Sequence, residues 1–285
     1  MIDNFHVSEE YANSRRSSEL NLQDAAWERS ARILEKIKNR FPGKRDITIL
    51  DMGCGSGYFL RFARQHGFEN LTGVEIDAEA SRYVNEELGI TCHNRFLDDI
   101  GFPDNRFDAI ILDQVLEHAE EPKVLLTSLQ RIIHPEGLIY IGVPNIDSAI
   151  IKILGKNHRH FNGWGHLNYF TVQSLDRITE ATGFEKIESY TLWEELTPAV
   201  LYCAFRHPEV YDPDPFSRFS GEIPSAIDRL DADEGGASAK NRPVISFAKK
   251  FILRSLLPID RVCKFLTNLF NKGAYIEYFG SAKAQ

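Results

Sequence analysis

Three glycines at alternate positions are the first residues whose spacing suggests chemistry. Gly53, Gly55 and Gly57 follow an apolar run, 47–50, that ends in Asp51. Because glycine lets the backbone bend tightly and lets a ligand approach closely, the run predicts a buried parallel strand that turns sharply into a helix. A dinucleotide fingerprint would place another glycine at position 58, which is a tyrosine. The loop therefore predicts a nucleoside without a diphosphate rather than NAD; a strand–turn–helix junction with no ligand is the alternative.

An acidic residue at the end of the next predicted strand could bind a ribose. Glu75 lies near the carboxyl end of a strand predicted over 71–77, twenty residues after Gly55. Open α/β sheets bind ligands at the carboxyl ends of their strands, where a carboxylate can accept hydrogen bonds from both ribose hydroxyls. We therefore expect Glu75, with its neighbour Ile76, to contact the nucleoside. The alternative for the acidic pair is helix capping, which we expect of Asp77.

The glycine run preceded by Asp51 resembles motif I of class I S-adenosylmethionine (SAM)-dependent methyltransferases. The resemblance implies SAM as cofactor and S-adenosylhomocysteine as product, with Asp51 near the amino group of the methionine moiety. It also implies an acidic residue at the adenine amino group, for which Asp98 is the first choice and Asp99 the second. The implied cofactor residues together are Asp51, Gly53, Cys54, Gly55, Gly57, Glu75, Ile76, Asp98, Asp99, Asp113 and Gln114.

The resemblance continues through the fifth predicted strand and into the segment His166-Leu167-Asn168-Tyr169-Phe170-Thr171. This segment is similar to one in a broad bacterial branch that includes ubiquinone-biosynthesis O-methyltransferases and enzymes of sugar and polysaccharide methylation. The resemblance therefore implies a small-molecule or glycan acceptor. A hydroxyl is the favoured methylated atom.

Methyl transfer from a sulfonium is an in-line displacement, and a hydroxyl acceptor must also lose its proton to a base. His118, just beyond the fourth predicted strand, and His166, in a loop rich in aromatic residues, are the candidate bases. We expect His160, Trp164 and Tyr169 of the same loop to contact the substrate. A structural hydrogen-bonding role is the alternative for each of the clustered histidines.

The stretch from Gln114 to His118 bears on metal binding. It resembles the part of ubiquinone-biosynthesis O-methyltransferases in which Glu-x-x-Glu-His can hold a divalent metal. Here Gln114 replaces the first glutamate, and an amide is a weaker ligand than a carboxylate for a hard cation. The sequence therefore predicts no metal.

Two other functions compete with a methyltransferase. One is a SAM- or nucleoside-binding module that has lost catalysis and acts through its insertion. The other is a nicotinamide-dependent oxidoreductase, which Tyr58 and the order of the motifs disfavour.

Strands alternate with helices along the chain in the rhythm of a doubly wound sheet. The predicted strands are 47–50, 71–77, 90–93, 107–112, 138–143, 184–192 and 274–280, and 134–137 is predicted to be a turn. The fold class is α/β, with a mostly parallel seven-stranded sheet of the Rossmann-like methyltransferase type and a helical or loop insertion before the last strand. The predicted parts are an N-terminal helical arm (1–45), a SAM-binding core (46–193), the insertion (194–273) and the last core strand with a tail (274–285).

The predicted insertion has halves of opposite charge. Residues 207–236 hold eight acids against two arginines and are expected to be rich in loops. Residues 244–272 hold six basic residues against one aspartate and keep apolar residues at helical spacing. A helical cap on the core and a basic amphipathic surface for an anionic membrane are the two interpretations.

The composition limits which partners and which cell compartment we expect for the protein. The 285 residues carry a net charge of −8, which argues against nucleic acid as a partner. No secretory signal and no apolar run long enough to cross a bilayer is visible in the sequence. The four cysteines are widely spaced, so we expect reduced thiols in a cytoplasmic protein, with membrane contact only at its periphery.

Overall fold

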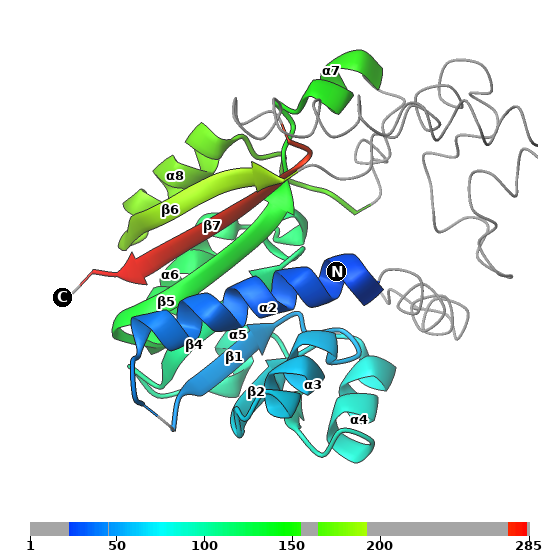
Figure 1. Ribbon diagram of the computed structural model, residues 1–285, viewed down its shortest axis with the longest axis vertical. Helices are drawn as coiled ribbons and strands as arrows, with labels where there is room; N and C mark the ends of the chain where they lie inside the picture. Colours follow the sequence, from blue (N-terminus) through cyan, green and yellow to red (C-terminus); the bar gives the residue numbers. More distant parts are fainter. Residues whose placement is uncertain (1–22, 45, 155–164, 193–272, 284–285) are drawn as a thin grey trace, which may run out of the picture. The chain divides into compact units, whose positions relative to one another are not determined.

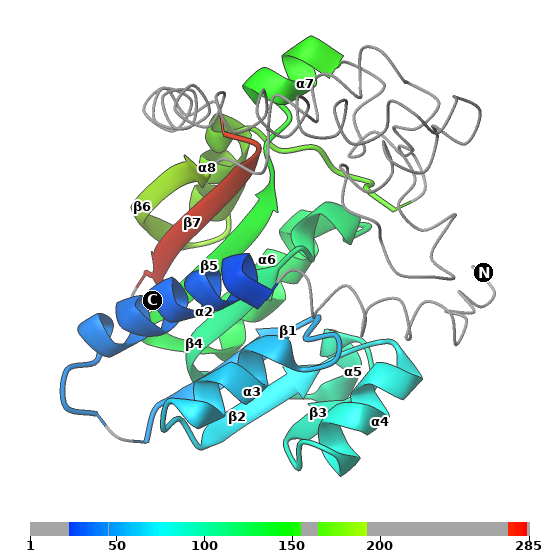
Figure 2. The same cartoon turned by 45° about the vertical axis from the view of Figure 1, so that its right-hand side comes forward.

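The computed structural model describes residues 23–44, 46–154, 165–192 and 273–283. Its seven-stranded sheet has the order β3-β2-β1-β4-β5-β7-β6 (Figure 1, with β3 labelled in Figure 2). The strands are β1 Thr48–Met52, β2 Asn70–Val74, β3 Thr91–His93, β4 Phe107–Asp113, β5 Ile133–Pro144, β6 Phe184–Leu192 and β7 Tyr275–Ala282. The helices are α2 Gln23–Arg40, α3 Tyr58–Gln65, α4 Ala78–Glu86, α5 Leu97–Ile100, the short 3-10 helix η1 Leu116–His118, α6 Pro122–Ile132, α7 Ala149–Leu154 and α8 Val172–Ala181.

The strands from β1 to β5 pair in parallel, and β7 runs in the opposite direction (Figure 1). This is the mostly parallel, seven-stranded sheet that the sequence predicts. The described residues fall into two compact units, of which the first holds 23–144, 165–190 and 276–283. The second holds 145–154, 191–192 and 273–275, so the sheet lies almost entirely in the first unit.

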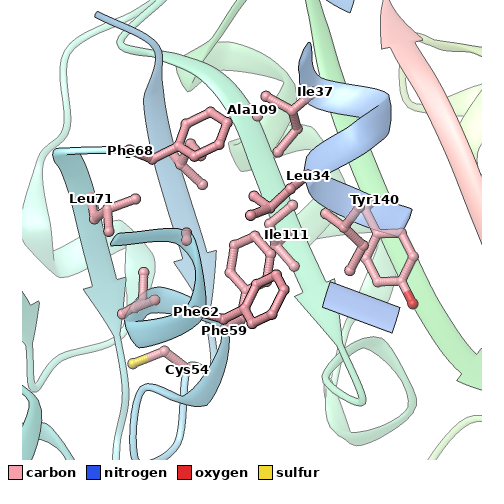
Figure 3. Packing of buried hydrophobic residues seen from close by; sticks show 14 of the residues in the cluster. Leu34, Ile37, Cys54, Phe59, Phe62, Phe68, Leu71, Ala109, Ile111 and Tyr140 are labelled. Carbon is pink, nitrogen blue, oxygen red and sulfur yellow. The ribbon is translucent and has the colours of Figure 1, made fainter. Parts of the chain in front are cut away.

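Alternate residues of the strands enter two separate hydrophobic clusters, one on each face of the sheet, because successive side chains of a strand point to opposite faces. On one face, residues of α2, α3 and α4 belong to one cluster with Ile49, Ile111 and Tyr140. Figure 3 shows Leu34 of α2 and Phe59 of α3 beside Ile111 in this cluster. Figure 2 shows α2 and α3 in front of the strands on this face. On the other face, residues of α5, η1, α6 and α8 pack on Leu50 and Ile110. Helices on both faces make the sheet doubly wound, as predicted.

Two predicted strand boundaries are wrong. The strand predicted over 71–77 ends at Val74, so Glu75 and Asp77 lie just beyond β2. Residues 134–137 belong to β5, which begins at Ile133 and pairs there with Phe107 of β4. The register shifts between Phe107 and Ala109, and Glu136 takes a φ of 65°. A bulge therefore absorbs the residues that resemble a turn, and the strand continues through them.

Parallel strands bring their carboxyl ends to one edge of the sheet. Asp51 pairs with Gly73, and Met52 pairs with both Val74 and Leu112. The glycine loop, the residues after β2 and those after β4 are therefore neighbours at this edge, where ligands of such folds bind.

Within the described parts of the chain, no helix is both long and apolar enough to cross a membrane. The basic segment 244–272 and most of the predicted insertion lie outside the described residues.

Candidate functional site

The glycine loop has a backbone that only glycine adopts easily. Gly53, Gly55 and Gly57 have φ angles of 69°, 53° and 76°. A Cβ at Gly53 would lie 2.6 Å from a methyl group of Val115, and one at Gly57 would lie 2.7 Å from a methyl group of Leu88. The positive φ angles and the close packing both require glycine at positions 53 and 57. These two constraints account for the glycines without reference to a ligand.

Glu75 connects the loop to the end of β2. Its Oε2 accepts a hydrogen bond from the Gly55 amide at 2.7 Å, and its Oε1 accepts one from the Asp77 amide at 2.9 Å. Asn94 donates from Nδ2 to the carbonyls of Glu75 and Ile76 at 2.9 and 2.8 Å. The carboxylate predicted to bind ribose is thus held at the sheet edge by backbone contacts. No pattern in the sequence points to Asn94, because its role depends on β3 lying beside β2.

The predictions for the two residues after Glu75 have different outcomes. Asp77 accepts a hydrogen bond from the Ala80 amide at 2.8 Å and caps α4, which confirms the expected cap. Ile76 is 62% exposed, an unusual environment for a branched apolar side chain at the edge of a sheet. Its contact with a nucleoside stays a prediction.

Asp51 is enclosed at the end of β1, with 4% of its surface exposed. Burial raises its pKa well above the ordinary value, and the carboxyls of Asp113 and Glu75 raise it further. A cation entering this environment would favour the ionised form of Asp51. The ammonium group of a methionine moiety is such a cation.

Asp113, at the end of β4, is ion-paired with helix α2. Arg29 donates from Nη1 to both carboxylate oxygens of Asp113, at 3.1 and 2.9 Å. The Nε of Arg29 also lies 3.8 Å from Oε1 of Glu277 on β7. Sequence reasoning missed Arg29, because nothing in the spacing of α2 shows which of its basic residues faces the cofactor edge.

The remaining predicted cofactor residues lie on separate elements. Gln114 has a φ of 59°, uncommon for a residue with a side chain, and its amide donates to the Gly142 carbonyl at 2.9 Å. Asp98 and Asp99 are exposed on α5, where Oδ1 of Asp98 accepts a hydrogen bond from the Ser128 hydroxyl at 2.8 Å. Adenine recognition by either aspartate stays a prediction.

Glu117, His118 and His166 come together beyond β4, although 47 residues of sequence separate the two histidines. The histidine rings have centroids 4.9 Å apart in an edge-to-face arrangement. Glu117 has no exposed surface, and neither of its side-chain oxygens has a hydrogen-bond partner among the described residues. Burial raises the pKa of Glu117 to about 8.

The protonation of His118 follows from its partner. Its Nδ1 lies 2.6 Å from the carbonyl oxygen of Gly165, which can only accept a hydrogen bond, so Nδ1 carries the proton. In the neutral ring, Nε2 is then the basic nitrogen, and it lies 4.0 Å from Oε1 of Glu117. This arrangement suits a general base and equally suits a metal ligand.

Backbone contacts fix the 165–170 segment against η1. The Leu167 and Asn168 amides donate to the Glu117 carbonyl at 2.9 and 3.0 Å, and Nδ2 of Asn168 donates to the Ala119 carbonyl at 2.6 Å. Tyr169 is partly exposed next to this anchor. His160 and Trp164, the other predicted substrate contacts, lie outside the described residues.

The donor atoms of Glu117, His118 and His166 lie within 4.8 Å of one another. Two imidazoles and one carboxylate form a donor set that suits a transition metal better than magnesium. Gln114, the position whose identity argued against a metal, is not part of this set.

Comparisons with known proteins agree with this geometry. Residues 26–189 match a protein family described as a methyltransferase domain. An uncharacterized protein of Methanocaldococcus jannaschii, MJ1123, is 27% identical over 57% of this chain and 76% of its own length. A ubiquinone biosynthesis O-methyltransferase of Rickettsia bellii is 27% identical over 40% of this chain, and the match spans about half (48%) of that enzyme.

Solved structures show the same fold at lower sequence identity. A SAM-dependent methyltransferase from Archaeoglobus fulgidus superimposes with a TM-score of 0.54 at 16% identity, covering 92% of this chain and 97% of the other. Phosphoethanolamine N-methyltransferase 2 of Haemonchus contortus, solved in complex with SAM, superimposes with a TM-score of 0.55 at 17% identity, covering 97% of this chain and 58% of the other. At these identities, the likeness is one of fold.

Proposed function

The chain belongs to the methyltransferase domain family and has the class I SAM-dependent methyltransferase fold, and on that premise we propose that it methylates a hydroxyl of a small molecule or glycan. The family and the fold class predicted from the sequence are both confirmed. SAM is the cofactor that the family uses. The acceptor, the methylated atom and the base are the proposed parts.

One observation carries the proposal most directly: the carboxylate of Glu75 bridges the Gly55 and Asp77 amides next to the buried Asp51. The two amides hold the carboxylate in place, and its remaining lone pairs can accept hydrogen bonds from the ribose hydroxyls. Asp51 supplies the negative charge for the methionine ammonium. The site therefore offers one carboxylate to the ribose and another to the methionine ammonium of SAM, from the adjacent strands β2 and β1.

In the proposed reaction, the acceptor oxygen attacks the SAM methyl group, the carbon–sulfur bond breaks, and a thioether leaves. The oxygen gives up its proton to Nε2 of His118, which becomes an imidazolium. The Gly165 carbonyl keeps the ring in the required tautomer, and the Glu117 carboxyl lies where its charged form would stabilise the imidazolium. His166, whose ring packs against that of His118, is the second candidate base.

A metal held by Glu117, His118 and His166 is the rival explanation for this cluster. Such an ion would supply Lewis acidity and lower the pKa of an acceptor hydroxyl. The residues fit the role, because an enclosed carboxylate and two imidazoles are suitable ligands. We favour the metal-free histidine base because a hydroxyl acceptor must lose its proton to a base, and Nε2 of His118 can accept that proton without an added ion.

Calorimetric titration with SAM tests the cofactor site. We expect the wild-type chain to bind SAM and the Glu75→Gln variant to bind at least tenfold more weakly, because the amide loses the charge that strengthens bonds to the ribose. Glu79→Gln, an exposed glutamate in the first turn of α4, is the matched control. Equal affinities in all three proteins would exclude this site for SAM.

Transfer of labelled methyl groups from SAM to components of a cell extract tests catalysis. Incorporation into small molecules or glycans supports the proposal if the label resists mild alkali, which cleaves methyl esters, and is released by reagents that cleave methyl ethers but not N-methyl groups. Binding of SAM with no incorporation would favour the alternative of a catalytically inactive binding module.

A further inference from the structure

Two buried cysteines meet beside the glycine loop. The Sγ of Cys54, within the loop, lies 3.6 Å from the Sγ of Cys92 on β3. Both are free thiols, 8% and 7% exposed. Figure 3 shows Cys54 at the end of the cluster formed by Phe59, Phe62 and Leu71. The methyl transfer proposed above uses neither sulfur.

A glycine on the intervening strand makes room for this contact. Gly73 of β2 pairs with Asp51 of β1 on one side and with Cys92 of β3 on the other. A Cβ at Gly73 would lie 2.8 Å from the Cys54 sulfur and 3.1 Å from the Cys92 sulfur. Any larger residue at position 73 would occupy the space in which the two sulfurs approach each other.

The two thiols are not equivalent. When Cys54 donates the sulfur–sulfur hydrogen bond, that bond lowers the pKa of Cys92 against the opposing effect of burial, and the Ser81 side chain acts in the same direction. The same sulfur–sulfur bond, together with burial, raises the pKa of Cys54. Cys92 is therefore the more nucleophilic sulfur and Cys54 the thiol beside it, an arrangement typical of thiol pairs that react with oxidants.

We propose that Cys54 and Cys92 form a modification site that a small hydroperoxide converts reversibly into a disulfide. The Cys92 sulfur attacks one peroxide oxygen, the oxygen–oxygen bond breaks, and Cys92 becomes a sulfenic acid with release of water or an alcohol. The Cys54 thiol then attacks the sulfenic sulfur and displaces a second water. Two thiols are oxidised and one peroxide is reduced. The low exposure of both sulfurs favours hydrogen peroxide over a protein disulfide as the oxidant.

The disulfide would act on cofactor binding through the loop, an effect that rests on the proposed SAM site. A disulfide bond is about 2.0 Å long, so the sulfurs must approach by about 1.5 Å. Cys54 sits between Gly53, whose amide donates to the Val74 carbonyl, and Gly55, whose amide donates to Glu75. Drawing Cys54 towards β3 displaces this backbone, which the proposed function places against SAM.

The test uses the full chain in a Cys203→Ser, Cys263→Ser background, which leaves Cys54 and Cys92 as its cysteines. After treatment with hydrogen peroxide, we expect an intact mass about 2 Da lower and a cross-linked peptide that joins Cys54 to Cys92 in a non-reducing digest. We expect SAM affinity to fall at least tenfold and to recover with dithiothreitol. Cys92→Ser is the matched control, with SAM affinity that peroxide leaves unchanged.

Peroxide products that carry added oxygen but no cross-link would overturn the proposal. A cross-link with unchanged SAM affinity would overturn the proposed effect of the disulfide on SAM binding. Failure of the reduced chain to bind SAM would count against the proposed function, while the mass and peptide measurements would still decide whether the disulfide forms. Gly73→Ala provides a second check, because its Cβ separates the sulfurs, and we expect cross-linking to slow at least fivefold.

Discussion

Glu117 is a carboxylic acid without exposed surface, and its burial determines how it responds to pH. Its folded-state pKa of about 8 lies above the ordinary value of 4.5. Between these two values the folded chain holds a proton that the unfolded chain has released. The free energy of unfolding must therefore decrease as pH rises from about 4.5 to about 8, and the contribution is fully present only below that range.

The first prediction follows from this fall in the free energy of unfolding with rising pH. Glu117→Gln should remove the decrease in unfolding free energy that Glu117 causes between pH 5 and pH 8, on the order of 3 kcal/mol. Urea denaturation at several pH values measures it. Glu121→Gln, an exposed glutamate three residues from η1, is the control and should keep the wild-type slope. A Glu117→Gln slope equal to that of the wild type would mean that Glu117 ionises normally.

The second prediction concerns the base. His118→Ala should lower turnover about 100-fold or more while changing SAM affinity less than threefold, because a base acts on the acceptor and not on the cofactor. Single-turnover transfer of labelled methyl groups and calorimetry provide the two numbers. If His166 also acts as a base, His166→Ala should likewise lower turnover with little change in SAM affinity. His134 is exposed, and His134→Ala should change neither turnover nor SAM affinity. Equal losses of turnover and SAM affinity would assign His118 to structure.

The third prediction separates the base from a metal. Dialysis against EDTA should leave turnover unchanged, since the proposed reaction needs no ion at Glu117, His118 and His166. Metal analysis of the protein before and after dialysis is the accompanying measurement. Loss of turnover that cobalt or manganese restores, with binding abolished in His166→Ala, would favour the metal.

At the scale of elements, helix α2 is held against the sheet by ion pairs as well as by apolar packing. Arg32 donates to Glu277 from Nη2 at 2.7 Å and from Nε at 3.3 Å, and the Tyr190 hydroxyl donates to the same carboxylate at 2.8 Å. Glu277 has no exposed surface. Because Arg29 of the same helix contacts Asp113, the placement of α2 also influences the cofactor edge.

The fourth prediction tests this fastening. Arg32→Ala should lower the free energy of unfolding by about 3 kcal/mol, because it leaves a buried carboxylate without its main cation. Lys36→Ala removes an exposed ion pair with Glu188 one turn along α2 and should cost less than about 1 kcal/mol. Denaturation of both variants supplies the comparison. Similar losses would show that the helix is held by its apolar face alone.

The elements differ in how well the sequence predicts them. β4 is buried at six successive positions, and all of them except Asp108 are apolar in the sequence, so its place was predictable. Thr171 begins α8 with a reciprocal cap to Ser174, and a threonine three residues before a serine at the start of an apolar helical pattern is a signal that the sequence shows directly. The β5 bulge was not predictable, because His134-Pro135-Glu136-Gly137 has turn composition, and only the pairing of Ile133 and Leu138 with β4 on either side of it places it within a strand.

The same limit applies to the site. The residues at the carboxyl ends of strands could be predicted, since parallel strands gather them at one edge. Arg29 could not, because its partner Asp113 is 84 residues away and the contact depends on how α2 packs. The cluster of Glu117 with the two histidines likewise depends on the 165–168 backbone returning to η1, a tertiary contact with no local pattern.

At the scale of the whole molecule, the strand order β5-β7-β6 has a consequence for biosynthesis. β6 pairs only with β7 within the described sheet, and more than 80 residues separate Leu192 from Tyr275 in the sequence. During translation, β6 leaves the ribosome before its pairing strand β7 has been made. Arg32 of α2 is likewise made 245 residues before its partner Glu277. At roughly 5–20 residues per second, Glu277 follows α2 after tens of seconds, and β7 follows β6 after about ten seconds. An unpaired β6 edge is exposed to other nascent chains throughout that time, so ribosome-associated chaperones would matter more to the yield of this enzyme than to that of a sheet assembled in sequence order.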